Sequence, residues 1–155
     1  MIPEKLVEFL QGPVVMNVGT RDEKLHPFLN WVIGVKVNAD RETITFFVHE
    51  PQSERMLRNL KDNGRVALVA AEVPSHETYQ FKGAYVSSRK SDDHDLALQE
   101  IYREKLIAHF KPLGEIWEEY WGGIAYTPSV AMTFRVEQIF VQTPGPGAGN
   151  KIDFE

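Results

Sequence analysis

Runs of apolar residues, separated by short polar turn segments, follow one another along most of this 155-residue chain. The runs are rich in β-branched and aromatic residues, which are typical of strands. We expect six strands, at residues 13–20, 27–38, 43–50, 65–73, 77–88 and 129–142. Because few long crossovers connect them, the sequence predicts a mainly β fold, a six-stranded antiparallel barrel with peripheral helices.

Two of these runs show the alternation of a strand. In the run 43–50, the residues expected on one face are Ile44, Phe46 and Val48, and those on the other are Thr43, Thr45, Phe47 and His49. The run 129–142 sets apolar residues against polar ones, namely Val130, Met132, Phe134, Val136 and Phe140 against Thr133, Arg135 and Glu137. We therefore expect a half-buried strand here that closes the sheet.

Apolar residues at helical spacing predict helices between the strands. The expected helices cover residues 3–12, 53–62, 91–110 and 115–123. Pro3 suits the start of the first helix and Gly12 its end, while Ser91 and Asp92 are suitable caps for the third. The aromatic residues on one side of the last helix are Trp117, Tyr120 and Trp121. They either form a packing face or line a substrate pocket or dimer contact.

Composition and charge narrow the class of protein. The chain has no cysteine, which excludes disulfides and thiolate chemistry. Its 17 basic and 22 acidic residues give a net charge of −5 without a long basic run, which argues against a general nucleic-acid-binding surface. No segment approaches the ~20 apolar residues of a membrane span, and the first residues do not resemble a secretory signal. We expect a cytoplasmic protein with one domain at 1–143, a helical insertion at 91–123 and a tail at 144–155.

Several candidate sites are weak in the sequence. Asp92, Asp93, His94 and Asp95 are adjacent at an expected helix start, where capping explains them better than metal binding. The five histidines show no paired metal-ligand spacing, so we expect no metal site. Ser53 has no base nearby in the sequence with which to form a hydrolase triad.

The stretch SERMLRNLKDN, residues 53–63, places a hydroxyl and a guanidinium at the opening of a helix directly after a strand. In a purely structural interpretation, Ser53 caps the helix and the arginines are solvated. Arg55, however, lies where the helix dipole repels cations, and a bound anion would reverse that penalty. A phosphate there accepts hydrogen bonds from backbone N–H groups, from Ser53 and from a guanidinium. The sequence therefore also supports a phosphate site.

The order of these parts resembles a known family. A strand, an S-x-R helix start, the pair NL and a strand beginning RVAL are similar to the pyridoxamine 5′-phosphate oxidase-like FMN-binding split barrels, including the small bacterial FMN-binding proteins. The resemblance covers about residues 2–90. It implies a split β-barrel that binds FMN non-covalently, as a homodimer with FMN at the interface.

Matched residue by residue, the resemblance implies a set of cofactor-binding positions. Arg55 and Ser53 match the residues that hold the FMN phosphate in this family. Asn30 and Trp31 match the strand that runs along the flavin.

The resemblance adds two further pairs. Val48 and His49 match the next strand where it turns towards the flavin, although His49 departs from the residue usual there. Gln80 and Lys82 lie on a strand that reaches the cofactor in some relatives. The C-terminal Trp and Arg signature of true pyridoxamine phosphate oxidases is not evident, which argues against pyridoxamine phosphate as the substrate.

The resemblance leaves two classes of function open. One is an oxidoreductase that exchanges hydride or electrons through FMN. The other is a non-catalytic electron-transfer, flavin-carrying or sensor protein, and the same barrel is also compatible with haem or a deazaflavin. The insertion at 91–123 adds enough surface to wall a substrate pocket, which favours an enzyme. The tail, which contains TPGPGAG, is either a flexible or partner-docked end or an arm that covers the neighbouring subunit near the flavin.

Overall fold

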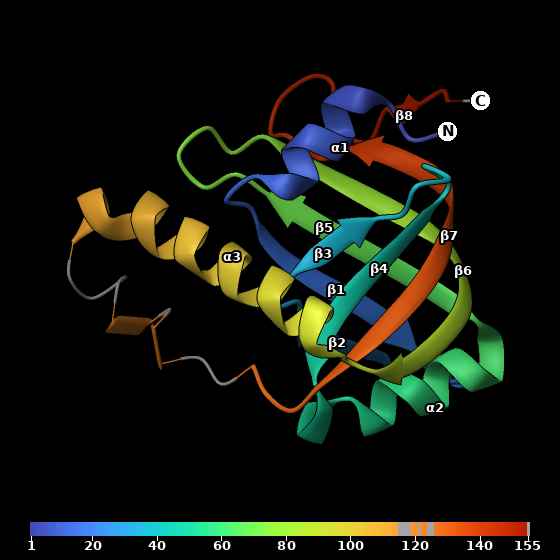
Figure 1. Cartoon of the computed structure of the whole chain (residues 1–155). Coiled ribbons are helices and arrows are strands. Elements are labelled where there is room, and N and C mark those ends of the chain that lie inside the picture. The colour runs from blue at the N-terminus through green and yellow to red at the C-terminus, as the bar shows by residue number, and fades with distance from the viewer. Residues whose placement is uncertain (115–118, 121, 124–125, 155) are drawn as a thin grey trace.

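The computed structural model describes residues 1–114, 119–120, 122–123 and 126–154. The strands are β1 (Val15–Arg21), β2 (Pro27–Trp31), β3 (Val35–Val37), β4 (Thr43–His49), β5 (Arg65–Ala71), β6 (Thr78–Lys90), β7 (Ser129–Val141) and β8 (Lys151–Ile152). The helices are α1 (Glu4–Gln11), α2 (Glu54–Asn63) and α3 (Asp93–Phe110), with the 3₁₀ turns η1 (Glu50–Gln52) and η2 (Lys111–Leu113). Figure 1 shows the strands curled around one another, with α1 and α2 at opposite ends.

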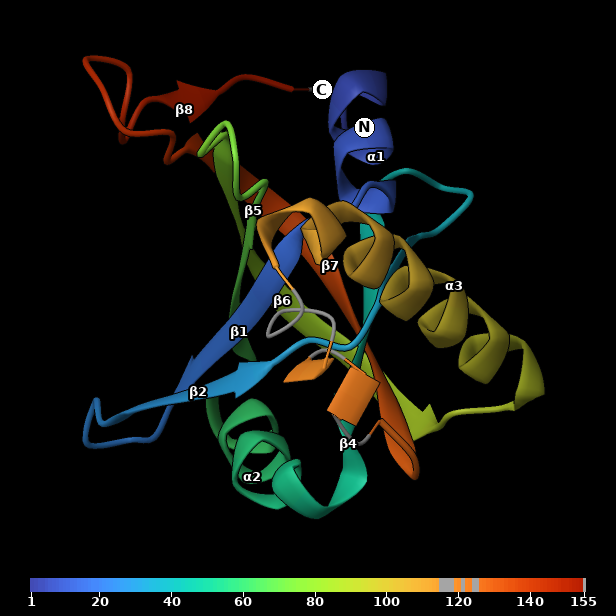
Figure 2. The ribbon, with the colours of Figure 1, turned by 90° about the vertical axis from the view of Figure 1, so that its left-hand side faces the viewer.

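The described strands form one antiparallel sheet in the order β2-β1-β5-β6-β7-β4-β3, with β8 beside β7. The segment 32–34 crosses the opening between the first and last strands of this curled sheet (Figure 2). There the Val32 N–H donates to the Met16 carbonyl of β1 at 3.1 Å, and the Ile33 N–H donates to the Phe47 carbonyl of β4 at 2.9 Å. The crossing joins the two edges although β2 and β3 do not pair, so the barrel is split.

The structure confirms a mainly β split barrel with peripheral helices. Its described part has eight strands where six were expected, because the crossing divides the run 27–38 and the tail adds β8. Gly34 permits this division. Its φ is +142°, and a Cβ there would meet the side chains of Phe47 and Gln99 at 3.2 and 3.3 Å. Because residue 34 is a glycine, the chain can turn from the crossing segment into β3 directly beside α3.

An apolar core fills the barrel, and each helix contributes to it. α1 and α2 close the two ends, and α3 lies along the side (Figures 1 and 2). The helix residues buried in this core are Leu6 and Leu10 of α1, Met56 and Leu60 of α2, and Tyr102, Leu106 and Phe110 of α3. Full burial of such apolar side chains stabilises the fold by about 1.5–3 kcal/mol each. The start of α2 is therefore fixed relative to the sheet.

β4 alternates between the two predicted faces, and both of these faces are buried. Ile44, Phe46 and Val48 belong to the main core of the barrel. Phe47, on the other face, is fully buried and packs with Ile33, Ala131 and, from α3, Leu98. The reason is that α3 covers the outer face of β4.

The alternation of β7 shifts at a β-bulge. Glu137 is an extra residue between the pairs that β7 makes with Lys82 and Gly83 of β6. Beyond it the faces exchange, so that Ile139 is fully buried. Phe140, predicted to face the core, lies instead on the other face, with the Lys82 ammonium 4.7 Å from its ring centroid. The prediction for Phe140 is therefore wrong, because one inserted residue reverses the parity of a strand.

The C-terminal tail returns to its own barrel. β8 pairs with β7, and the Val141 N–H donates to the Asn150 carbonyl at 2.9 Å. Ile152 and Phe154 pack against the core. The tail is thus docked on its own chain through β8, while the predicted contact with a neighbouring subunit stays a prediction.

Most of the helix expected at 115–123, with Trp117 and Trp121, lies outside the described residues. Tyr120 is described and is 50% exposed. Within the described ranges, every helix is too short or too polar to cross a bilayer.

Candidate functional site

The turn η1 and the start of α2 follow directly on β4, in the order that the phosphate-site interpretation requires. Ser53 occupies the N-cap position of α2 but is 2% exposed, and its hydroxyl donates to the Glu50 carbonyl at 2.8 Å. The predicted side-chain cap is therefore wrong, because this hydroxyl stabilises the preceding turn instead. The N–H groups in the first turn of a helix have no acceptor within the helix, so those not capped remain available to another acceptor.

Arg55 lies in the first turn of α2 with an exposed side chain. Its guanidinium carbon is 5.1 Å from the centroid of the Phe28 ring, a cation–π contact with β2. Arg58, one turn further along, lies 3.7 Å from Glu54. In the described part of the chain, Arg55 has no such carboxylate partner. It is thus a cation held on an aromatic face near a helix start.

Arg55 borders a surface hollow of about 530 Å³ between α2 and the β1–β2 turn. The residues that line the hollow are Asp22, Glu23, Lys24, His26, Arg55, Arg58, Asn59 and Asp62. The Asp22 carboxylate accepts the His26 backbone N–H and lies 3.1 Å from the imidazole, and the backbone bond is the main reason that the pKa of Asp22 is lowered. The charges that line the hollow balance, because it contains three carboxylates and three cationic side chains. These are Asp22, Glu23 and Asp62, and Lys24, Arg55 and Arg58. An anion at this place would therefore be held by Arg55 rather than by the field of the whole hollow.

Asn30 connects β2 to the same turn. Its side chain is buried and donates to the Gln52 carbonyl at 2.9 Å. Phe28, two residues earlier, shares this face of β2 and contacts Arg55. Trp31 points to the opposite face and is 41% exposed. The structure thus brings Asn30 of β2 and Arg55 of α2 to one turn, whereas Trp31 lies on the other face of β2.

The sequence analysis missed two contributors to this place, Phe28 and Gln52. Phe28 could have been found from the sequence, because it lies two residues before Asn30 on the same strand and so points to the same face. Gln52 contributes its backbone carbonyl, for which the residue type gives no signal.

Val48 and His49, which were expected to lie near the flavin, are the last two residues of β4 and directly precede the turn η1. The side chain of Val48 is fully buried in the core, so only its backbone is available to a ligand. His49 is half-buried and pairs with Ser129 of β7 immediately before η1. Within the described residues, the imidazole of His49 has no hydrogen-bond partner.

Gln80 and Lys82 lie elsewhere, on the outer face of β6. β1 and β5 separate β6 from β2, which corresponds to about 14 Å at the usual strand spacing. Lys82 packs on Phe140 and, with Arg21 and Arg65, lines a second hollow of about 470 Å³. Within one chain, the structure does not bring Gln80 and Lys82 to the other predicted residues.

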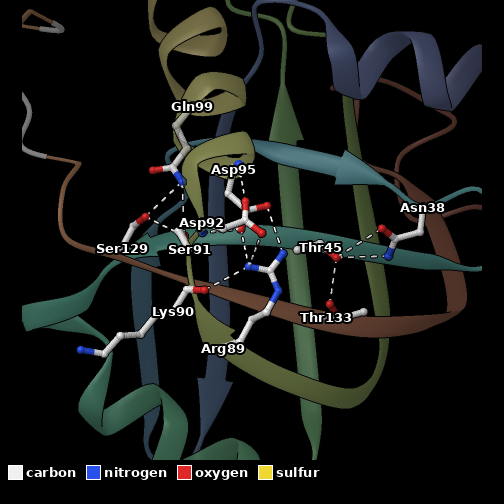
Figure 3. Close-up of polar contacts among 10 residues, drawn as sticks. All are labelled: Asn38, Thr45, Arg89, Lys90, Ser91, Asp92, Asp95, Gln99, Ser129 and Thr133. Atoms are coloured by element: carbon white, nitrogen blue, oxygen red, sulfur yellow. Dashed lines mark hydrogen bonds and ion pairs between the residues drawn. The ribbon is translucent and has the colours of Figure 1, made fainter.

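A polar cluster fixes the start of α3 (Figure 3). Arg89 of β6 donates to the buried carboxylate of Asp95. Asp92 and Asp95 exchange backbone-to-carboxylate hydrogen bonds of 3.0 Å, a capping box. Burial raises the pKa of Asp95, but the hydrogen bonds from Arg89 and Asp92 outweigh it, and the pKa is lowered. The capping role predicted for Asp92 is confirmed. Among the described side chains, no group of three or more His, Asp or Glu is arranged to hold a metal ion.

The described residues thus form a split barrel in which β2, η1 and α2 converge at Arg55. The sequence model of the pyridoxamine 5′-phosphate oxidase family matches residues 2–141. The chain therefore belongs to the pyridoxamine 5′-phosphate oxidase family. The match extends well past residue 90, so it includes α3 and the whole of β7.

Several solved structures share the fold. The HupZ protein of Group A Streptococcus is 19% identical, with 96% of this chain and 100% of that chain covered and a TM-score of 0.58. A structure named F420 reductase is 17% identical, with coverage of 89% and 98% and a TM-score of 0.58. An FMN-binding protein from Syntrophomonas wolfei is 10% identical, with coverage of 88% and 85% and a TM-score of 0.53. No curated protein matches the chain.

Proposed function

We propose that this protein binds FMN non-covalently, with the phosphate at the start of α2, and acts as an oxidoreductase. The observation that carries the proposal is the state of Arg55, an exposed guanidinium held over Phe28 without a carboxylate partner in the described part of the chain. A cation in the first turn of a helix is unfavourable by itself, and a phosphate would offset that cost. Family membership and the fold shared with an FMN-binding protein support FMN as the source of that phosphate.

The described residues fit such a cofactor. Arg55 and the first-turn N–H groups of α2 supply donors for a phosphate. Ser53 supports the turn beneath it, because its hydroxyl is engaged with Glu50. Asn30 fixes the turn against β2, and Trp31 offers an aromatic surface beside it. When bound, FMN supplies the hydride- or electron-transfer chemistry, while these residues bind and orient it.

The proposal includes a homodimer with FMN at the interface. Gln80 and Lys82 lie about three strand spacings from β2, so they would reach the cofactor only from a second copy of the chain. An apolar patch supports such an interface, since Leu29 and Trp31 on the outer side of β2 are 65% and 41% exposed. The second copy would cover this surface.

A deazaflavin is the second candidate cofactor, because the fold is shared with a structure named F420 reductase. Both cofactors carry a phosphate, so Arg55 would have the same role in either case. An absorption spectrum of the purified protein, with the mass of any released cofactor, separates them. A protein that takes up haem and ignores both would overturn the proposal.

The phosphate assignment has a direct test with a matched control. Replacing Arg55 (Arg55→Ala) should weaken FMN binding by one to two orders of magnitude, as expected for a charge-assisted bond of roughly 1.5–3 kcal/mol. Arg58→Ala, one turn further along α2, should leave the Kd unchanged because Arg58 is engaged with Glu54. Titration of flavin fluorescence measures both. Equal affinity in the parent and Arg55→Ala would show that the phosphate lies elsewhere.

A second measurement separates an enzyme from a carrier. The FMN-loaded protein should oxidise NADH or NADPH in the steady state with a defined acceptor. Stoichiometric FMN without turnover of either nucleotide would favour the carrier or sensor.

A further inference from the structure

The second hollow, on the outer face of the sheet across β1, β5 and β6, is rich in positive charge. It has a volume of about 470 Å³, and its lining includes Arg21, Arg65 and Lys82. Among its described lining residues, Glu137 of β7 carries the one carboxylate. We call this place the basic hollow. The chain has a net charge of −5, so three cations beside one carboxylate reverse the sign of the charge locally.

The register of the strands brings the three cations together on one face. Ala67 of β5 pairs with Lys82 of β6, and Arg65 lies two residues before Ala67 on the same face, so it is a diagonal neighbour of Lys82. Gly19 of β1 pairs with Ala67 from the other side, and Arg21 lies two residues beyond Gly19, towards Arg65. Such neighbours are only about 7–8 Å apart or less, and like charges in these positions are destabilising. An anion between them would remove that cost.

Two of the three cations have no carboxylate partner within the described residues. Arg65 lies 3.0 Å from Glu137 and is thus paired. The Lys82 ammonium lies 4.7 Å from the centroid of an aromatic ring of β7. The guanidinium of Arg21 donates to the main-chain carbonyl of the next residue at 3.3 Å. These contacts orient the side chains without neutralising them, so about two positive charges remain available to a ligand.

The basic hollow is open to a ligand because its floor is made of small residues. Gly19 has no side chain, and a Cβ built there would be 3.8 Å from its nearest neighbour, so packing does not fill this place. Ala67 adds only a methyl group to the floor. The side chains of Arg65 and Glu137 at the rim are 61% and 46% exposed. The volume of the hollow is within the range of sites that hold small organic ligands.

We propose that the basic hollow binds a small ligand that carries a diphosphate group, as nucleoside diphosphates do. The phosphate oxygens accept hydrogen bonds from Arg21 and Lys82, and Arg65 borders them. A diphosphate carries at least two negative charges, which matches the two cations that have no carboxylate partner. Its size also suits the hollow better than that of a single phosphate.

The position of the basic hollow suggests which diphosphate it takes. Lys82 is the residue proposed to reach the flavin of a second copy, so a ligand beside Lys82 would lie next to that flavin in the dimer. The two halves of a nicotinamide dinucleotide are joined by a diphosphate. We therefore identify the ligand with the nicotinamide dinucleotide that reduces FMN, and this step alone rests on the proposed function.

A series of adenine compounds tests the charge requirement. In isothermal titration calorimetry of the purified protein, ADP should bind with a Kd of about 1 mM or tighter. AMP, which has a single phosphate, should bind roughly tenfold more weakly, and adenosine should give no measurable binding. Failure of ADP to bind, or equal affinities for ADP and adenosine, would overturn the proposal.

Variants of opposite effect locate the binding. Arg21→Gln should lower the affinity for ADP by about tenfold or more, because a charge-assisted bond is lost. Glu137→Gln should raise the affinity, because it frees Arg65 for the ligand. Lys90→Gln, at the far end of β6, is the matched control and should leave the affinity unchanged.

An affinity that rises in one variant cannot result from damage to the fold. If Arg21→Gln does not fold, Glu137→Gln and the comparison of ADP with adenosine decide the question. ADP affinities equal to that of the parent in both Arg21→Gln and Glu137→Gln would place the site elsewhere and overturn the proposal.

The same variants distinguish this proposal from the proposed function. Arg55→Ala should lose FMN affinity and keep ADP affinity, and Arg21→Gln should do the reverse. In the FMN-loaded protein, Arg21→Gln should raise the KM for NADH or NADPH with little change in kcat, as expected for lost ground-state binding. An unchanged KM would overturn the identification of the ligand as the reductant.

The two proposals also fail separately in the parent protein. A parent that binds ADP but ignores FMN would overturn the cofactor and leave the basic hollow as a diphosphate site. One that binds FMN and oxidises NADH or NADPH but ignores ADP would overturn the diphosphate site and leave the proposed function.

Discussion

The side-chain amide of Asn30 donates a hydrogen bond of 2.9 Å to the main-chain carbonyl of Gln52, 22 residues further along the chain. The bond links the edge strand β2 to the turn from which α2 begins. Asn30 is 7% exposed, so the link is shielded from water. The bond thus adds to the core packing of α2 in holding β2 and Arg55 together, which makes Asn30 a positioning residue of the proposed site.

Asn30→Ala should lower the free energy of unfolding by about 0.5–1.5 kcal/mol, since one hydrogen bond is lost. It should also weaken FMN binding by up to about tenfold, because the turn before α2 is released from β2. Asn63→Ala is the matched control, as it removes a 2.7 Å bond from an asparagine side chain to the Arg21 carbonyl at the other end of α2. Urea unfolding and FMN titration of both variants would test the assignment. Equal losses of affinity would refute a positioning role for Asn30.

The proposed dimer predicts a response to charge on the outer face of β2. Leu29→Glu should give a monomer in light scattering and a protein with reduced FMN affinity, because it buries a carboxylate without a partner at the interface. Val86→Glu is the control, since Val86 is also an exposed apolar residue, at 54%, but lies on β6. A dimer that survives Leu29→Glu would place the interface on another face.

The carboxylate of Asp95 predicts a pH dependence of stability. Its pKa is lowered in the folded protein, so its contribution is present above the unfolded-state pKa of about 3.9 and is lost as the pH falls through the folded value. Asp95→Asn should therefore be less stable than the parent near neutral pH, and the difference should shrink below about pH 4. Thermal unfolding measured across this range gives the answer. A difference that is constant with pH would mean that the charge of Asp95 is not what stabilises the start of α3.

The bulge between β6 and β7 predicts that Gly83 tolerates no side chain. A Cβ at Gly83 would lie 1.8 Å from the Arg135 carbonyl oxygen, so Gly83→Ala requires the backbone to move. We expect a loss of about 4 kcal/mol or more, or failure to fold. Gly147→Ala, where the nearest atom to a Cβ is 3.9 Å away, should have little effect. Soluble yield and urea unfolding would compare the two variants, and similar stabilities would show that the bulge is not required.

The sequence by itself determined the local features of this protein. Period-two runs of apolar residues gave the strands, and helical spacing gave α1, α2 and α3 within a few residues of their observed ends. The S-x-R pattern after β4 placed a cation at a helix start. These features depend on residues close together in the chain, so short-range chemistry is enough to predict them.

Only the tertiary structure decided which faces and residues meet. α3 covers the outer face of β4 and buries Phe47, and the extra residue Glu137 turns Phe140 outward. Gln99 illustrates the limit best. Its place on the buried side of α3, in phase with Tyr102 and Leu106, was a visible signal of an unusual polar residue. Whether its amide would be satisfied depended on Ser91 and Ser129, which lie on other segments, because hydrogen bonding in a core is settled by contacts between segments that are distant in the sequence.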